Sequence, residues 1–275
     1  MPEKNTPRTA DADCSDYVQE LVRILARLRA PDGCPWDAKQ THESLKPYIV
    51  EEVAEFLDAV DERDDPNMAE ELGDVLLQIV FHCRIAQEDG RYDLQTAARL
   101  CCEKMVRRHP HVFGEASVED AEGVIDQWEK IKREEKGKEK RSDSAVEGVP
   151  RHLPALQRAR KIQHKAAKVG FDWPAIDGVL AKIEEELLET REALRDGERD
   201  AIAEEIGDLL FSVVNLSRFC DECPEELLHA TIRKFDRRFR SMENLLKQRG
   251  KETTGCEIDE LEQLWQEAKN QENEK

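Results

Sequence analysis

Hydrophobic residues recur every three to four positions along most of this 275-residue chain, which is the spacing of one face of an α-helix. Runs of β-branched residues are scarce, and Glu, Ala, Leu, Arg and Lys dominate the composition. The pattern predicts an all-α fold, with a loop over 33–37. Amphipathic helices are expected over residues 15–29, 94–108 and 156–167, around Val124, Ile125 and Trp128, and around Trp265.

The segment Glu51–Asp74 predicts two helices folded back on each other, because the helix-breaking residues 64–67 interrupt its pattern. The same arrangement returns at Glu185–Asp208, 134 residues later and without insertion, with Asp196-Gly197 at the turn. Apolar residues continue beyond Asp74 and supply a buried stripe. The chain is therefore predicted to be a tandem repeat of helical-bundle domains.

Each hairpin carries four acidic residues that the helical period places on facing sides. On each helix two of the acids lie three residues apart and therefore share one face. If the hairpin is symmetric, each acid on one helix lies directly opposite an acid on the other. These acids are Glu52, Glu55, Glu71 and Asp74 in the first copy, and Glu186, Glu189, Glu205 and Asp208 in the second. Their repetition favours a site over a solvated acidic face, which is the alternative for a single hairpin.

Carboxylates gathered in this way repel one another. At a separation of ~5 Å and an effective dielectric near 20, the repulsion is ~3 kcal/mol, which a bound cation removes. A ligand set made only of oxygen selects Mg²⁺, with Mn²⁺ as a substitute, and these ions share their remaining positions with water and phosphates. The spacing predicts a metal site in each copy.

Composition and charge limit the classes of function that the chain can have and indicate where its domains begin and end. A formal net charge of −19, with 37% charged residues, argues against a protein that wraps nucleic acid or lies on an anionic membrane. No apolar run approaches a membrane span and the first residues are polar, so we expect a cytoplasmic protein. The charged stretch 133–149 predicts a linker between domains at 14–132 and 150–275, and residues 1–13 are expected to be disordered.

A basic Lys-x-x-Arg-Arg cluster follows each acidic hairpin. Its residues are Lys104, Arg107 and Arg108 in the first copy, and Lys234, Arg237 and Arg238 in the second. Lys and Arg in this arrangement can hold a polyphosphate, although basic residues at a helix end also complement the helix dipole. Trp128 and Trp265 can stack on a base, but a single Trp is more often part of a core.

Together these motifs resemble the MazG-type nucleoside triphosphate pyrophosphohydrolases in their tandem two-domain form. The resemblance covers nearly everything from Leu21 to Gln266. It is carried by CPWD at 34–37, the doubled EExxE and ExxD pairs, RRHPHVF at 107–113, VGFDW at 169–173 and KFxRRF at 234–239. It implies all-α bundles that pair into a homodimer. It also implies hydrolysis of many nucleoside triphosphates to monophosphate and pyrophosphate as house-cleaning, with any regulatory protein partner left open.

The resemblance also implies roles for individual residues. In tandem members the second copy is the working site, so Glu186, Glu189, Glu205 and Asp208 become the Mg²⁺ ligands. The residues matched to nucleotide binding are Lys182, Glu185, Glu186, Glu204, Asp208, Lys234, Arg237, Arg238 and Trp265, joined by Lys104, Arg107, Arg108 and Lys168. Glu185 and Glu189 are equal candidates for the general base that activates water. One position departs from the pattern: relatives have a lysine shortly before the second acidic pair, where this chain has Ala201.

Two non-hydrolytic alternatives remain. A ferritin-like di-iron bundle needs two Glu-x-x-His motifs on facing helices, and the chain has one, from Glu226 to His229, outside both hairpins. The other alternative is a degenerate scaffold that binds a nucleotide or a partner without cutting it. Cys220 and Cys223 have the spacing of a metal or redox pair, but no second pair completes a zinc set, so a reduced pair at a helix end is favoured.

Overall fold

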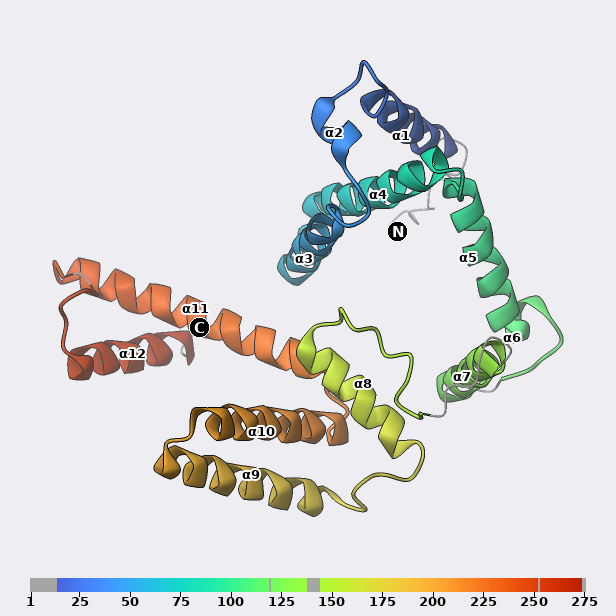
Figure 1. Cartoon of the computed structure of the whole chain (residues 1–275). Helices are drawn as coiled ribbons and strands as arrows, with labels where there is room; N and C mark the ends of the chain where they lie inside the picture. The colour runs from blue at the N-terminus through green and yellow to red at the C-terminus, as the bar shows by residue number, and fades with distance from the viewer. Residues whose placement is uncertain (1–13, 119, 138–143, 252, 274–275) are drawn as a thin grey trace, which may run out of the picture. The chain divides into compact units, whose positions relative to one another are not determined.

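The computed structural model describes residues 14–118, 120–137, 144–251 and 253–273, and every regular element in these ranges is a helix (Figure 1). The predicted all-α fold is confirmed. The chain divides into two compact units, Met1–Glu139 and Lys140–Lys275, each with its own acidic hairpin. This division falls within the predicted linker 133–149, but the preceding helix continues to Gly137, so the first part of that stretch is helical.

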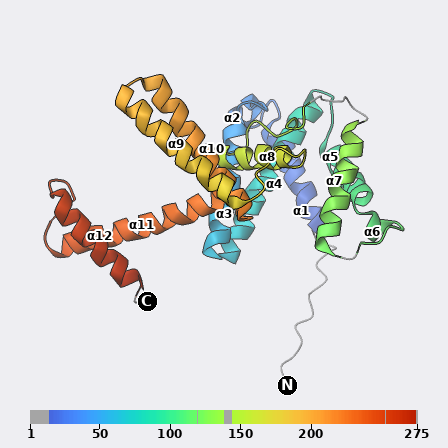
Figure 2. The same cartoon turned by 90° about the horizontal axis from the view of Figure 1, so that it is seen from below.

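The first unit contains seven described helices. Their bounds are α1 Cys14–Leu28, α2 Pro35–Lys39, α3 Lys46–Glu62, α4 Asp65–Glu88, α5 Leu94–Arg108, α6 Pro110–Phe113 and α7 Ala121–Gly137. Helices α3 and α4 form the hairpin, α1 packs along α4, and α5 contacts α4, α6 and α7 (Figures 1 and 2). Leu25, Leu45, Val80, Phe81 and Ile85 form the buried core that holds α1 and the start of α3 against α4.

Residues 33–37, expected to be a loop, are partly helical. Helix α2 begins at Pro35, whose fixed φ suits the first turn of a helix. Arg29 ties this segment to α4 with a side chain that is only 7% exposed: it donates to the carbonyl oxygens of Asp37 and Gln40 and forms an ion pair with Glu88. The loop prediction was wrong because a five-residue helix is too short to show a hydrophobic period.

The turns of both hairpins follow from local residues. In the first, Arg63 is left-handed, with a φ of 57°, and the Asp64 side chain accepts a hydrogen bond from the backbone N–H of Asn67 at 3.2 Å. Residues 65–67, expected in the turn, are therefore already the first turn of α4. In the second hairpin, Gly197 is left-handed, with a φ of 77°, directly after α9, where the sequence places the turn.

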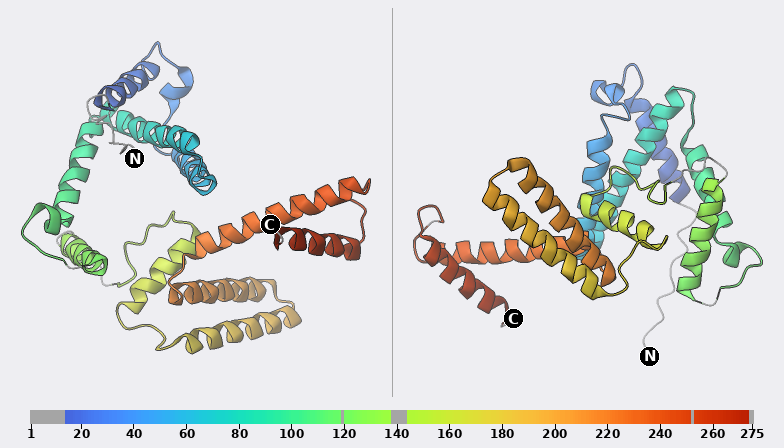
Figure 3. Two further views of the ribbon diagram at one scale, coloured as in Figure 1. Left: turned by 180° about the vertical axis from the view of Figure 1, so that it is seen from behind. Right: turned by 60° about the horizontal axis from the view of Figure 1, so that its bottom comes forward.

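The second unit contains five described helices. Their bounds are α8 Ala155–Ala167, α9 Ile176–Asp196, α10 Arg199–Phe219, α11 Pro224–Gln248 and α12 Ile258–Asn273. Helices α9 and α10 form the hairpin, α8 packs against α10, and α11 pairs with α12 around Met242, Leu246 and Leu264 (Figure 3). Across the described ranges of both units, no helix is long and apolar enough to cross a membrane.

Candidate active site

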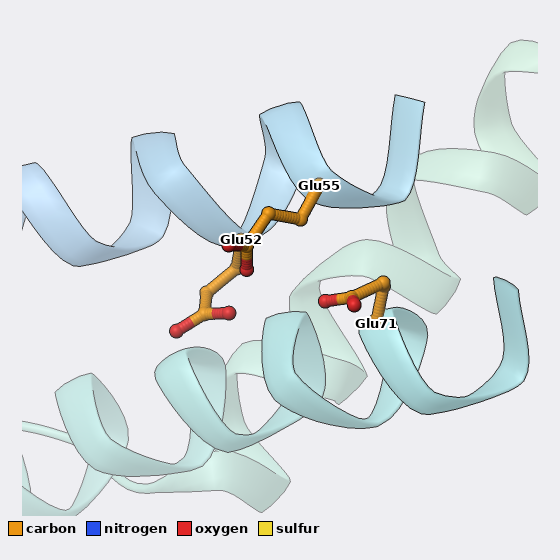
Figure 4. Close-up of side chains that lie close together, drawn as sticks. All are labelled: Glu52, Glu55 and Glu71. Carbon is orange, nitrogen blue, oxygen red and sulfur yellow. The ribbon is translucent and has the colours of Figure 1, made fainter. Parts of the chain in front are cut away.

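Three acids of the first hairpin converge. Glu52 and Glu55 project from α3 and Glu71 from α4, and one carboxylate oxygen of each lies within 4.8 Å of the others (Figure 4). Glu52 and Glu71 are half-buried, whereas Glu55 is exposed. Asp74, the fourth predicted ligand, lies outside this group of three but close enough to act on Glu52 electrostatically. We call Glu52, Glu55 and Glu71 the N-terminal triad.

Two members of the N-terminal triad, Glu52 and Glu71, have raised pKa values. Burial raises the pKa of Glu52, the charge of Asp74 raises it further, and a hydrogen bond from Gln78 opposes both. Burial also raises the pKa of Glu71, followed by the charges of Glu55 and Asp74. In the described part of the chain no lysine or arginine forms an ion pair with these acids, so their negative charge has no basic partner there.

The second hairpin gathers a different three of its four acids. Glu186 of α9 and Glu205 and Asp208 of α10 place oxygens within 4.8 Å of one another, and Glu186 is only 5% exposed. Glu189 lies outside this C-terminal triad, although burial and then the charges of Glu186 and Glu205 raise its pKa. Burial and the charges of Glu186 and Asp208 likewise raise the pKa of Glu205. The two copies therefore present triads that differ in one member.

A lysine distinguishes the C-terminal triad from the N-terminal one. The Lys182 ammonium lies 2.8 Å from an oxygen of Glu185 and 2.8 Å from an oxygen of Glu186. These hydrogen bonds, that of Glu185 first, raise the pKa of Lys182. At the repeat offset the first copy has Tyr48, whose ring packs edge-on against Trp36 with the centroids 5.9 Å apart. Only the second of the two triads therefore has a positive charge at this position.

The two arginines of the first basic cluster converge on one glutamate that the sequence did not single out. Arg107 and Arg108 of α5 each donate to Glu135 of α7 at 2.6 Å. Hydrogen bonds from Arg108 and then Arg107 lower the pKa of Glu135 to about 2. Trp128 of the same helix lies under the Arg108 guanidinium, 5.3 Å from its ring centroid. The pair therefore joins α5 to α7.

The second unit repeats this arrangement. Arg237 and Arg238 of α11 both donate to Glu272 of α12, which lowers the pKa of that carboxyl, Arg238 having the larger effect. Trp265 of α12 packs against Phe235, with the ring centroids 5.1 Å apart. Glu272 lies 34 residues after Arg238, a separation that no helical period reveals. Among the described contacts, no hydrogen bond or ion pair joins either arginine pair to an acidic triad.

The other predicted residues lie on the same helices or at their ends. Glu185 and Glu204 are exposed on α9 and α10, Lys234 is exposed on α11, Lys168 follows α8, Lys104 is half-buried on α5, and Ala201 is half-buried on α10. Cys220 follows α10 and Cys223 precedes α11, and both are free thiols. The hairpins thus hold the acids and Lys182, while the basic clusters belong to the α5–α7 and α11–α12 pairs.

A family model described as the MazG nucleotide pyrophosphohydrolase domain matches the chain twice, over residues 40–113 and 176–241. The two matches cover just over half of the chain and include both acidic hairpins. The chain belongs to the MazG family. The resemblance carried by the sequence motifs is confirmed, and so is the tandem arrangement of two MazG domains.

MazG relatives match along almost the whole chain. The nucleoside triphosphate pyrophosphohydrolase/pyrophosphatase MazG of Thermotoga maritima is 50% identical over 252 residues, which are 91% of this chain and 95% of that protein. The nucleoside triphosphate pyrophosphohydrolase of Escherichia coli K12 is 44% identical over 262 residues, 94% of this chain and 98% of its own. A crystal structure of a mazG-related protein from Thermotoga maritima matches 42% of this chain and 98% of its own, at 30% identity and a TM-score of 0.36.

Proposed function

We propose that this chain hydrolyses nucleoside triphosphates to nucleoside monophosphate and pyrophosphate with Mg²⁺, for which Mn²⁺ substitutes. The observation that carries the proposal is the C-terminal triad, whose oxygens lie within 4.8 Å of one another beside the Lys182 ammonium. An all-oxygen set of this kind suits a hard divalent cation that also binds phosphates. The relatives named nucleoside triphosphate pyrophosphohydrolases, 44% and 50% identical, support the reaction class.

Each residue of the second hairpin has its own role in the proposed reaction. The C-terminal triad would hold the cation, which when bound neutralises phosphate charge and lowers the cost of water attack. Lys182 would exchange its carboxylate partners for a phosphate oxygen, another charge-assisted hydrogen bond. Of the two candidate general bases, we favour Glu189, because burial and the charges of Glu186 and Glu205 raise its pKa. Its raised pKa strengthens it as a proton acceptor for the attacking water.

Broad base specificity follows from the kinds of groups available. Lys234 offers a donor that suits phosphate oxygens, and Arg237 and Arg238 would do so by exchanging Glu272 for a phosphate. Trp265 would offer an aromatic face on which any base can stack. Neither contact distinguishes one base from another. We therefore propose that the substrates include ATP and the other common triphosphates, in keeping with house-cleaning of the nucleotide pool in the cytoplasm.

A homodimer is part of the proposal. The hairpin of the second unit exposes apolar side chains that a soluble monomer would normally cover. They include Leu187, Leu188, Ile206, Leu210, Phe211 and Val213, each more than 40% exposed. Extended exposed apolar surface of this kind usually marks a protein interface. Pairing of two hairpins would bury it and form a four-helix bundle around the acidic site.

The test is to incubate the chain with dGTP and Mg²⁺ and to identify the products. We expect dGMP and pyrophosphate in equal amounts, with activity abolished by excess EDTA and restored by Mg²⁺ or Mn²⁺. Release of orthophosphate instead would contradict the proposed bond cleavage, and undiminished turnover in excess chelator would exclude the metal. Nucleotide binding without any cleavage would favour the alternative, a non-hydrolytic regulatory protein.

A further inference from the structure

An exposed tryptophan lies at the start of the second hairpin. Trp173 belongs to the loop between α8 and α9, and the residue is 46% exposed. Its indole atoms Cδ2 and Cε3 lie against Gly178 in the first turns of α9. The packing is so close that a Cβ atom added to Gly178 would come within 2.7 Å of Cε3. The indole can therefore rest directly on α9 because glycine has no side chain there.

The position of Gly178 on α9 places the indole next to the charged groups of the candidate site. Gly178 lies four residues before Lys182 and eleven before Glu189, so these three positions share one face of the helix. At a rise of 1.5 Å per residue, Gly178 and Lys182 are about 6 Å apart along the helix axis. Along α9 the indole therefore comes first, Lys182 follows one turn later, and Glu186 of the C-terminal triad follows after another turn.

Two contacts fix the loop that carries Trp173. The Trp173 backbone N–H donates to Oδ1 of Asp172 at 2.9 Å. The same carboxylate accepts from both terminal nitrogens of Arg218 on α10, at 2.5 and 3.0 Å, and the Arg218 side chain is only 12% exposed. A bidentate pair of this kind fixes orientation as well as distance. Both helices of the hairpin therefore hold the indole in place before a ligand arrives, which lowers the entropy cost of binding.

The first copy pairs the tryptophan before its hairpin with another aromatic ring. Trp36 meets Tyr48 edge-on, with the ring centroids 5.9 Å apart, and Tyr48 stands at the repeat position of Lys182. The second copy thus has a cation where the first has the partner ring. In the described part of the chain, no aromatic ring contacts Trp173. The second copy therefore combines an accessible indole with a group that can bind phosphate.

We propose that Trp173 stacks on the base of the nucleoside triphosphate whose phosphates bind at Lys182 and the C-terminal triad. This inference rests on the proposed function and adds a residue that holds the base. The sugar of a nucleotide separates its base from its phosphates, so the base belongs beyond Lys182 on the side away from the ion, where the indole lies. An indole can stack on any base, and a purine gives the larger overlap. Trp265, the other candidate for stacking, already packs against Phe235.

The experiment measures KM and kcat for dGMP formation from dGTP, together with inhibition by inorganic tripolyphosphate, which has phosphates but no base. Trp173→Leu should raise KM by about tenfold, a change typical of the loss of one base–aromatic stack, and should leave kcat within about twofold. The inhibition constant of tripolyphosphate should not change, and Trp173→Phe should restore most of the affinity. Gly178→Ala should also raise KM, because its methyl group displaces the indole although alanine favours the helix. The matched control, Trp36→Leu in the first copy, should leave KM within about twofold.

Two results would overturn the inference. One is an unchanged KM in Trp173→Leu whose fold is verified by circular dichroism and thermal unfolding. The other is an equal weakening of dGTP and tripolyphosphate, which would place the effect at the phosphates and not at the base. Calorimetric binding of α,β-methylene-dGTP with Mg²⁺ separates this inference from the proposed function. If Trp173→Leu weakens that binding about tenfold but the unmodified chain forms no dGMP, the proposed hydrolysis fails while the base contact stands.

Discussion

Conservative substitutions of the acids in the two hairpins should separate the roles of the two copies. Glu186→Gln and Asp208→Asn keep the shape of the side chain but remove one of three carboxylates that lie within 4.8 Å of one another. Loss of even a supporting group of a metal site costs 10- to 100-fold, so loss of a ligand should lower the rate of pyrophosphate release by at least ~100-fold, about 2.7 kcal/mol on the barrier. Glu52→Gln and Asp74→Asn should leave most of the rate, because the first copy has Tyr48 in place of Lys182.

The assay is initial-rate pyrophosphate release at saturating Mg²⁺ and substrate, with the two sets of variants compared at equal protein concentration. Thermal unfolding of each variant checks that a lost rate is not a lost fold. Equal residual rates in the two sets would mean two independent active sites and would refute the assignment. A loss confined to the Glu52 and Asp74 variants would place catalysis in the first copy.

Three further outcomes are expected. Purine and pyrimidine triphosphates should differ by about tenfold or less in kcat/KM, and a thousandfold preference, ~4 kcal/mol, would reveal a hydrogen-bonding base pocket. Arg29→Met should lower the free energy of unfolding in urea by ~2 kcal/mol, because it removes charge-assisted hydrogen bonds from a nearly buried guanidinium to the carbonyl oxygens of Asp37 and Gln40. The exposed Arg23→Met should change it by less than ~1 kcal/mol. The pKa of Glu135 is about 2 in the fold against an ordinary 4.5, so its contribution to stability is present above pH 4.5 and is lost as the pH falls toward 2. Glu135→Gln should flatten the dependence of unfolding free energy on pH over that range.

Helical periodicity was sufficient for the long elements of the fold. The helix expected over 94–108 has those bounds, and the helix expected over 15–29 spans Cys14–Leu28. Both hairpins form where the acidic repeat and its breakers place them. The short helix α2 escaped prediction because its stability comes from outside itself. Arg29 of α1 donates to the carbonyl oxygen of Asp37 within α2 and to that of Gln40, the residue after α2. No local sequence pattern predicts such a contact.

The candidate site was predictable only where its contacts run along one helix. Lys182 lies four residues before Glu186 and forms an ion pair with it. Residues four apart are neighbours on a helix, so this pair could be predicted from the sequence. Glu135 and Glu272 bond to arginines 27 to 35 residues away, on another helix, so only the tertiary structure reveals them. Gln78 lies one turn beyond Asp74 on the same helix face, but no chemical motif in the sequence marks its hydrogen bond to Glu52 across the hairpin.

The repeat spacing alone would make the two copies equivalent, since all four acids recur at one offset. The side chains around those acids break this equivalence through charge. A carboxylate as deeply buried as Glu186 is costly unless it is paired, and Lys182 supplies the pair within the chain. Glu52 is less buried and accepts its hydrogen bond from the neutral Gln78 amide, so no positive charge offsets the repulsion that Asp74 exerts on it. The same four-acid pattern is therefore set in two different electrostatic environments, one with an ammonium group bound to a buried carboxylate and one with a tyrosine at the matching position.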